Sequence, residues 1–384
     1  MSGHDAGAQT RWLRLLGVLL AGLAMVWLAV AYLAFSTEGS DEDGPLPREE
    51  YAWAFDLEAY LGAADRVASE GSPYAEAVTA GAFESGPGGL YYYSPVLAVA
   101  LLPVEDAPLS DISTWWFTMH VLALIAACAL MPVGTLVRLF AFAVAAFSLA
   151  VVRDMALGNI STLLLLPTVM AWRWMDRPLG SAALALAISL RPSLGLLLIW
   201  QGLRRRWHAL AWTIASAVVL VVLTLPFVGI DGYLDYLDAL RNLNTPSNEA
   251  APPNGWENHD LGEVARSLGA SADAMGLVRL GSIVLGVGAM LLSLRRDREV
   301  SYMVTLMASF VVVPILWDHY LVMLVIPAAF LAQRWRPVAI LLPLLSWLPS
   351  LGFFAIVAAM LLPFLVRDAT PETPDASPEA VPAA

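Results

Sequence analysis

The sequence contains no lysine, so all 21 of its basic side chains are arginines. We ascribe this to a composition bias and draw no function from it. The single cysteine, Cys128, lies in an apolar run, which excludes an internal disulfide, and no zinc-ligand spacing occurs. Charged residues are also scarce, at 14%, where soluble domains average about 25%. No basic stripe is present, so nucleic acid is not an expected partner.

Apolar residues are abundant instead. They make up 59% of the chain, and the mean hydropathy is +0.67. Many runs approach or exceed the roughly 17–25 residues that cross a bilayer, so we predict an all-α polytopic helical bundle with about 11–12 membrane segments, short or re-entrant ones included. Residues 1–366 would form one membrane domain, and 367–384 a disordered cytoplasmic tail.

Arginines set the predicted orientation. Arg11 and Arg14 precede the first span, 12–35, and an acidic segment follows it. Because its apolar part is longer than the roughly 7–15 residues of the apolar region of a signal peptide, we expect a retained helix. The positive-inside rule then places the N-terminus in the cytoplasm and loop 36–91 outside a cell membrane that the chain crosses many times.

The remaining spans alternate between arginine-flanked and acidic ends. The predicted spans are 112–131, 134–152, 158–175, 179–190, 193–203, 208–229, 275–294, 300–316, 321–333, 337–347 and 351–366. A second outer loop, 230–274, is expected to hold a helix at 231–242 and another short helix that starts at Asn258. Segment 94–104 is either re-entrant or part of a broken helix, and the sequence leaves both open.

One apolar run is interrupted by Arg191-Pro192. Proline lacks the amide donor and disfavours helix at the preceding residue, so the run should break there. Both flanks of 179–203 carry arginines, which requires two short helices that meet on the outer side. Arg191 would then either reach the surface with its charged head or bind a phosphate.

The first outer loop is expected to carry one or two amphipathic helices, the first at 57–69 and the second at 73–83. Asp56, Glu58 and Tyr60 open it, and Gly71-Ser-Pro-Tyr74 follows. Two acids near a helix start can accept a proton and hold a second donor. The simpler interpretation is a surface helix with Asp56 as its N-cap and an apolar stripe of Leu57, Tyr60, Leu61 and Ala64.

Polar residues gather at the predicted outer ends of the spans. The candidate substrate-binding residues are Glu58, Tyr60, Tyr74, Tyr93, Asn159, Arg191, Asn258, Asp260, Asp318, His319 and Tyr320. Several have a structural alternative: an aromatic belt for Tyr91 to Tyr93, a helix cap for Asn159, a helix-terminal acid for Asp260 and an interfacial polar pair for Asp318 and His319. An arginine, carboxylates and an apolar groove suit an enzyme that acts on a lipid head group.

Six short motifs resemble the glycosyltransferase 87 family in the same order. The first is Asp56-x-x-x-Tyr60-x-x-Ala-Ala64 with Gly71-Ser-Pro-Tyr74. The others are Tyr93-Ser-Pro95 where the family has Tyr-Pro-Pro, Gly158-Asn-Ile160 for Gly-Gln-x-Asn, Arg191-Pro192 for Lys-Pro, Asn258-His-Asp-Leu261 for Asn-Gln-Ser-Leu, and Trp317-Asp-His-Tyr320 for Trp-x-His-His. The resemblance covers roughly residues 50–335.

The resemblance implies a GT-C fold related to polyprenyl-phosphomannose-dependent α-(1,2)-mannosyltransferases. It implies Asp56 as catalytic base, inversion at the sugar, a polyprenyl-phosphate sugar donor (mannose first), a glycan or glycolipid acceptor, contact with membrane lipid and an active site facing outside. Arg191 would stabilise the leaving phosphate, and His319 and Tyr320 would position donor or acceptor. No cofactor is implied. Arginine in place of lysine at 191, one histidine in place of two, and Asp260 in place of serine indicate that donor or acceptor can differ.

Two other functions fit a polytopic chain. A transporter or lipid-linked-sugar flippase would place ionisable groups near the midplane and use alternating access, whereas a non-catalytic scaffold needs no such groups. The sequence does not identify the sugar, the acceptor or the linkage. Paired outer acids could hold a divalent ion, although no ligand spacing demands one.

Overall fold

The computed structural model describes residues 3–38, 53–80, 91–242, 261–313, 315–348 and 351–367. These residues form helices and no strand, which confirms the all-α class. The α-helices are α1 Gly3–Glu38, α2 Phe55–Glu70, α3 Glu76–Thr79, α4 Pro95–Leu101, α5 Leu109–Leu130, α6 Thr135–Ala146, α7 Leu149–Leu157, α8 Ser161–Arg173, α9 Pro178–Leu190, α10 Leu196–Leu203, α11 Trp207–Asn242, α13 Leu261–Ser267, α14 Ala272–Ser293, α15 Arg298–Val311, α16 Val325–Arg334 and α17 Gly352–Leu361. The 3₁₀ segments are η1 Leu102–Val104, η2 Pro192–Gly195, η3 Asp318–Leu324, η4 Pro337–Trp347 and η5 Leu362–Leu365.

Several helices are long and apolar enough to cross a membrane. Within the described ranges these are Arg11–Ala34, Leu109–Leu130, Trp207–Asn242 and Asp273–Ser293, with the bent pair α6 and α7 as a fifth candidate. Shorter apolar helices, α9 and α10 among them, pack between these helices. The predicted polytopic bundle is therefore confirmed, and many of its segments are shorter than a full crossing.

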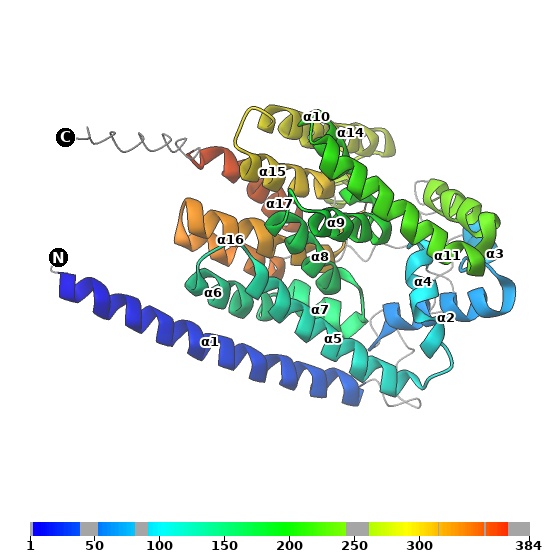
Figure 1. Cartoon of the computed structure of the whole chain (residues 1–384), viewed down its shortest axis with the longest axis horizontal. Helices are drawn as coiled ribbons and strands as arrows, with labels where there is room; N and C mark the ends of the chain where they lie inside the picture. Colours follow the sequence, from blue (N-terminus) through cyan, green and yellow to red (C-terminus); the bar gives the residue numbers. More distant parts are fainter. Residues whose placement is uncertain are drawn as a thin grey trace, which may run out of the picture.

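The bundle has two chemically different ends. In Figure 1, α2, α3 and α4 gather at the end remote from the start of α1; we call this the site end. At the other end, the arginine end, Arg173 donates to the carbonyl of Leu130 (3.0 Å) and Arg204 to that of Leu294 (2.6 Å). Arg206 and Arg298 both pair with Asp176 there. Guanidinium groups thus bind carbonyls at the ends of neighbouring helices.

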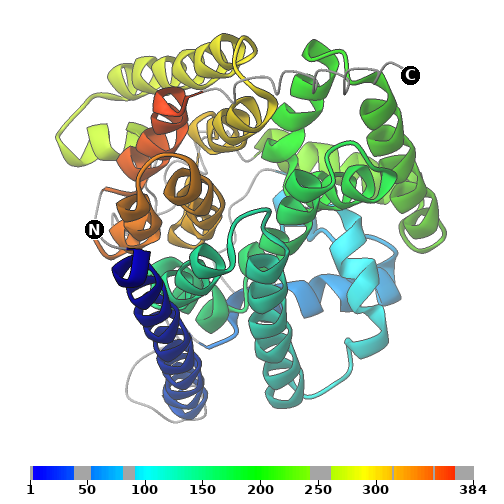
Figure 2. The same ribbon diagram turned by 60° about the vertical axis from the view of Figure 1, so that its left-hand side comes forward.

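Segment 94–104 does not cross the bundle. The hydroxyl of Tyr32, late in α1, lies 2.7 Å from that of Thr114, early in α5, so α1 finishes and α5 starts at the same end. Figures 1 and 2 place α4 beside α2 and α11, both of which it contacts. The single crossing between residues 90 and 131 is therefore α5 alone.

The predicted span at 134–152 is broken into two helices. The chain forms α6 and α7, which are bent by 59° relative to each other, and α7 continues to Leu157. The break has a local cause, because the Ser148 hydroxyl accepts the amide of Val151 (3.3 Å) and so starts a new helix. This bend carries the end of α7 toward α2, with which it is in contact.

The predicted break at Arg191-Pro192 is confirmed, because α9 ends at Leu190 and Pro192 opens η2. The predicted helix at 231–242 is the outer arm of α11, which turns at Gly229 (φ 61°, ψ −172°), a backbone conformation open essentially to glycine alone. The helix expected at 73–83 is short: α3 covers Glu76–Thr79, and the residues beyond 80 lie outside the described range.

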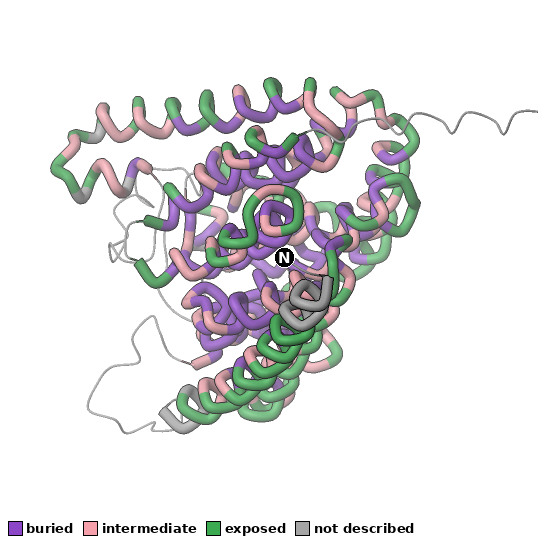
Figure 3. Tube along the Cα trace, turned by 90° about the vertical axis from the view of Figure 1, so that its left-hand side faces the viewer, coloured by how far each residue is buried: buried purple, intermediate pink, exposed green. Residues whose placement is uncertain are grey.

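Helix α15 lies at the centre of the bundle. Every residue from Val300 to Val311 is buried, whereas α1 is exposed along most of its length (Figure 3). The exposed side chains of α1 are apolar, among them Trp12, Leu19 and Val26. In lipid such a surface needs no protein cover, and packing rather than water exclusion holds the helices together.

The two ends should lie on opposite sides of the membrane. Asp106, between η1 and α5, and Arg177, before α9, are exposed at the site end and the arginine end. We expect an impermeant maleimide to label only one of the variants Asp106→Cys and Arg177→Cys in sealed vesicles, and both after permeabilisation. The parent chain, whose Cys128 is buried, is the unlabelled control. Labelling of both variants from the same side would contradict this topology.

Candidate functional site

Asp56 is held in place by the start of α2. Ala54, the residue before the helix, has a left-handed backbone (φ 63°), and its amide donates to the carbonyl of Ala156 at 2.8 Å. The N-cap is therefore Ala54 and not Asp56, contrary to the simpler interpretation of the sequence. Asp56 lies in the first helical turn, where a carboxylate is favoured by the helix dipole. The predicted stripe is confirmed, since Leu57, Tyr60, Leu61 and Ala64 are buried.

Gly158 lets α2 approach the end of α7. It has φ +67°, and a Cβ added there would lie 2.7 Å from Cβ of Leu57. The Gly158 carbonyl accepts the indole N–H of Trp116 at 2.6 Å. A side chain at this position would thus be strained and would also push α2 away. The close approach places Asp56 next to Asn159.

The side chain of Asn159 joins three other polar residues. Its Nδ2 donates to Oδ2 of Asp56 (2.8 Å) and to the hydroxyl of Tyr93 (3.0 Å). Its Oδ1 accepts the hydroxyl of Ser161 (2.9 Å) and the Ser161 amide (3.1 Å). Asn159 therefore caps the first turn of α8 and orients Asp56 at the same time, and it is buried, at 3% exposed.

Arg191 is buried rather than extended to the surface. It is 5% exposed, its Nη2 donates to the Ser161 hydroxyl (3.0 Å), and its Cζ lies 3.5 Å from the centre of the Tyr320 ring. Its Nη1 is buried with no hydrogen-bond partner among the residues that the structure describes. A buried cation with an unused donor is costly. It is therefore suited to an anionic ligand.

Residues 318–320 continue the site along η3. His319 contacts the Tyr320 ring, with 4.8 Å between ring centres. Asp318 pairs with Arg153 of α7. Burial, with Arg191 and Arg153 adding, lowers the pKa of His319 well below its usual 6.5. His319 is thus neutral near pH 7, and the two arginines supply the positive charge around it.

The tyrosines have mainly structural contacts. Tyr74 donates to the carbonyl of Tyr93 (2.6 Å), and Tyr91 donates to that of Ser94 (2.6 Å). Tyr91 is fully buried, so the proposed aromatic belt is wrong for this residue. Tyr60 packs edge-on against Tyr93, at 5.1 Å between ring centres. Burial raises the pKa of Tyr93 above 10.0, so its phenol is neutral.

The structure brings most of the predicted residues to one end and separates a few. Asp56 and Tyr93 bond to Asn159, Ser161 links Asn159 to Arg191, and Tyr320 stacks on Arg191. Glu58 is half-buried on α2, with no contact to this group among its recorded bonds. Asn258 and Asp260 lie outside the described residues, so their predicted roles stay predictions.

The sequence interpretation missed Ser161, which bonds to Asn159 and Arg191, and three polar residues near it, His120, Arg153 and Asp154. His120 and Asp154 are completely buried within 3.5 Å of each other, and Asp154 accepts the amides of Ser161 (3.1 Å) and Thr162 (2.7 Å). The available signal was the Arg153-Asp154 dipeptide in an apolar run, since ionisable residues within membrane segments are rare and usually functional.

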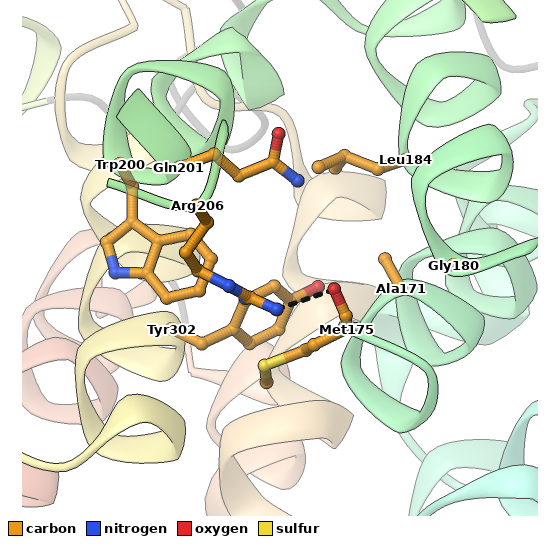
Figure 4. A pocket seen from close by; sticks show the side chains of 8 residues that line it. All are labelled: Ala171, Met175, Gly180, Leu184, Trp200, Gln201, Arg206 and Tyr302. Carbon is orange, nitrogen blue, oxygen red and sulfur yellow. Dashed lines mark hydrogen bonds between the residues drawn. The ribbon is translucent and has the colours of Figure 1, made fainter. Parts of the chain in front are cut away.

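A small cavity lies away from this group. It is lined by Met175, Trp200, Gln201, Arg206 and Tyr302 among others, and Arg206 crosses it to bind the Met175 carbonyl at 2.6 Å (Figure 4). Its lining residue on α8, Ala171, lies about 15 Å along that helix from Ser161, toward the arginine end. Across the described ranges, no three His, Cys, Asp or Glu side chains group as metal ligands.

Comparison with known proteins supplies the family. The family model for glycosyltransferase family 87 matches residues 91–317, more than half of the chain. The chain belongs to this family. The match includes Tyr93, Asn159 and Arg191, and it starts after Asp56 and ends before Asp318. Searches of the curated proteins and of the solved structures gave no match.

The close approach at Gly158 can be tested with a matched glycine. Gly158→Ala introduces left-handed strain of about 1–2 kcal/mol and a clash with Leu57. Gly71→Ala at the other end of α2 introduces the same strain (φ +78°) with nothing within 4 Å. We expect both variants to lose some thermal stability, and only Gly158→Ala to lose most of its transferase activity. Similar activity in the two variants would contradict a role for the α2–Gly158 contact.

Proposed function

We propose that this protein transfers a sugar from a polyprenyl-phosphate donor to a hydroxyl of a glycan or glycolipid acceptor, with inversion. Mannose is the leading candidate for the sugar. The observation that carries the proposal is the connected set of a half-buried carboxylate, Asp56, and a buried guanidinium with a free donor, Arg191. Family membership supplies the reaction class, a glycosyl transfer. A base and an anion-binding group on one site are what this reaction requires.

The base would be Asp56. An acceptor hydroxyl gives its proton to the carboxylate as its oxygen bonds to the anomeric carbon from the side opposite the phosphate. The bond between that carbon and the phosphate oxygen breaks, and its electron pair stays on the phosphate. Asn159 holds Oδ2 of Asp56 at 2.8 Å, which fixes the direction from which the acceptor is deprotonated.

The leaving group would be a polyprenyl phosphate, which gains one negative charge as the bond breaks. Arg191 is placed to bind it, because its Nη1 is buried with an unused donor. Tyr320 stacks on the guanidinium and helps to hold it in place. Stabilisation of charge that develops in the transition state is usually the largest contribution to such catalysis.

The site end would face outside the cell membrane. Support comes from the arginines gathered at the other end, as the positive-inside rule requires of the cytoplasmic face. The polyprenyl chain would lie along apolar helix surfaces in the lipid. A transporter or flippase is the alternative, and a transfer assay separates the two functions.

The first prediction from this proposal concerns the base. With purified protein in lipid and polyprenyl-phosphate mannose or glucose as donor, Asp56→Asn should reduce transfer at least about 100-fold, since it removes the base with little change in volume. Thermal stability should stay close to that of the wild type. Asp65→Asn, an exposed carboxylate on the same helix, is the control and should transfer normally. Equal transfer by wild type and Asp56→Asn would exclude Asp56 as the base.

The second prediction from this proposal concerns binding of the donor phosphate by Arg191. Arg191→Gln removes the charge and should lower kcat/KM for the donor about 10- to 100-fold, in line with the roughly 1.5–3 kcal/mol of a charge-assisted hydrogen bond. Arg191→Lys should keep more activity than Arg191→Gln because it keeps the charge. Arg336→Gln, exposed at the arginine end, is the matched control. If Arg191→Gln used the donor as well as Arg336→Gln, phosphate binding by Arg191 would be excluded.

A further inference from the structure

The fully buried His120 of α5 lies beneath the site and takes no part in the proposed transfer. Its Nδ1 lies 2.7 Å from the carbonyl oxygen of Trp116, and its Nε2 is hydrogen-bonded to the carbonyl oxygen of Asn159. A carbonyl oxygen can only accept, so each ring nitrogen must donate. A neutral imidazole has one N–H, and only the imidazolium has two.

Asp154 provides the opposite charge. Its Oδ2 lies 3.5 Å from Nε2 of His120, and both side chains are 0% exposed. Its two oxygens also accept the amides of Ser161 and Thr162 at the start of α8. The amides of Ser161 and Thr162 and the hydroxyl of Thr162 can all donate to a carboxylate, and the ring nitrogen of His120 is directed at the carbonyl of Asn159. These contacts fit a carboxylate.

Burial alone opposes both charges, because each ion loses its hydration. Here the cation donates to two carbonyls, the anion accepts two amides, and the two charges are neighbours. Arg191 reaches the same group through Ser161, whose hydroxyl accepts from Arg191 and whose amide donates to Asp154. The buried pair is thus hydrogen-bonded on both sides, which is the condition for a buried ion pair to persist.

We propose that His120 and Asp154 form a buried imidazolium–carboxylate pair that positions Asn159 for the reaction. His120 fixes the carbonyl of Asn159, and Asp154 fixes the amide of Ser161 two residues later. The side chain of Asn159 between these two anchors then holds Asp56 and Tyr93. His120 and Asp154 are positioning residues, and this role rests on the proposed function of Asp56.

The charge of His120 can be measured without any transfer assay. The protein is labelled with ¹⁵N-histidine in lipid, and the signals of His120 are assigned by their loss in His120→Gln. At pH 8, where an ordinary histidine is neutral since its pKa is about 6.5, both ring nitrogens of His120 should be protonated. An unprotonated ring nitrogen that belongs to His120 would overturn the ion pair.

The positioning role is measured by kinetics. Asp154→Asn keeps the shape of the side chain and removes its charge. It should lower kcat on the order of 100-fold, as expected when a reacting group is misplaced by about 1 Å, and leave the donor KM within about twofold. His208→Gln, on an exposed histidine of α11, is the control for His120→Gln and should transfer normally.

The outcomes separate the two proposals. No transfer by the wild-type protein, with a doubly protonated His120, would reject the proposed function and keep the ion pair. Transfer by the wild type, together with a normal kcat in Asp154→Asn, would reject the positioning role. Asparagine resembles a neutral Asp154, so this result would mean that the negative charge is not needed. A rise in donor KM at unchanged kcat would also reject it and assign Asp154 to ground-state binding.

Discussion

The amide of Asn159 is the interaction on which the arrangement of the site depends. A single planar group donates to Asp56 and Tyr93 and accepts from Ser161, so the geometry of α2, of the segment before α4 and of α8 is fixed at one point. These segments are far apart in sequence, and α2 approaches α7 only because residue 158 is a glycine. The site is therefore built by tertiary contacts to a short turn, with α7 and α8 as its rigid supports.

Much of this architecture could be predicted from the sequence, because membrane helices have strong local signals. The break at Arg191-Pro192, the buried stripe of α2 and the two chemically different ends follow from proline chemistry, helical periodicity and charge. The path of segment 94–104 could not be predicted, since α4 is apolar like a span but packs at the site end. The connection between Asp56 and Asn159 depends on the left-handed turn at Gly158, which a single sequence does not reveal.

The hidden polar pair shows why residues in apolar runs are hard to interpret. His120 lies in a predicted span whose neighbouring residues are mostly apolar. Asp154 lies just after the end of another predicted span. Periodicity describes which face of a helix is apolar and does not show that two such faces meet. Only the bend between α6 and α7, together with α5, brings the two side chains within 3.5 Å.

The short length of α9 affects the lipid around the protein. Its 13 residues extend about 20 Å, whereas the hydrocarbon core of a bilayer is about 30 Å thick. A helix of this length that starts at one boundary of the core ends about 10 Å before the other boundary, so Arg191 would lie within the thickness of the bilayer. A lipid phosphate bound at Arg191 would lie below the plane of the surrounding head groups, and a thick membrane would raise the energy needed to bring it there.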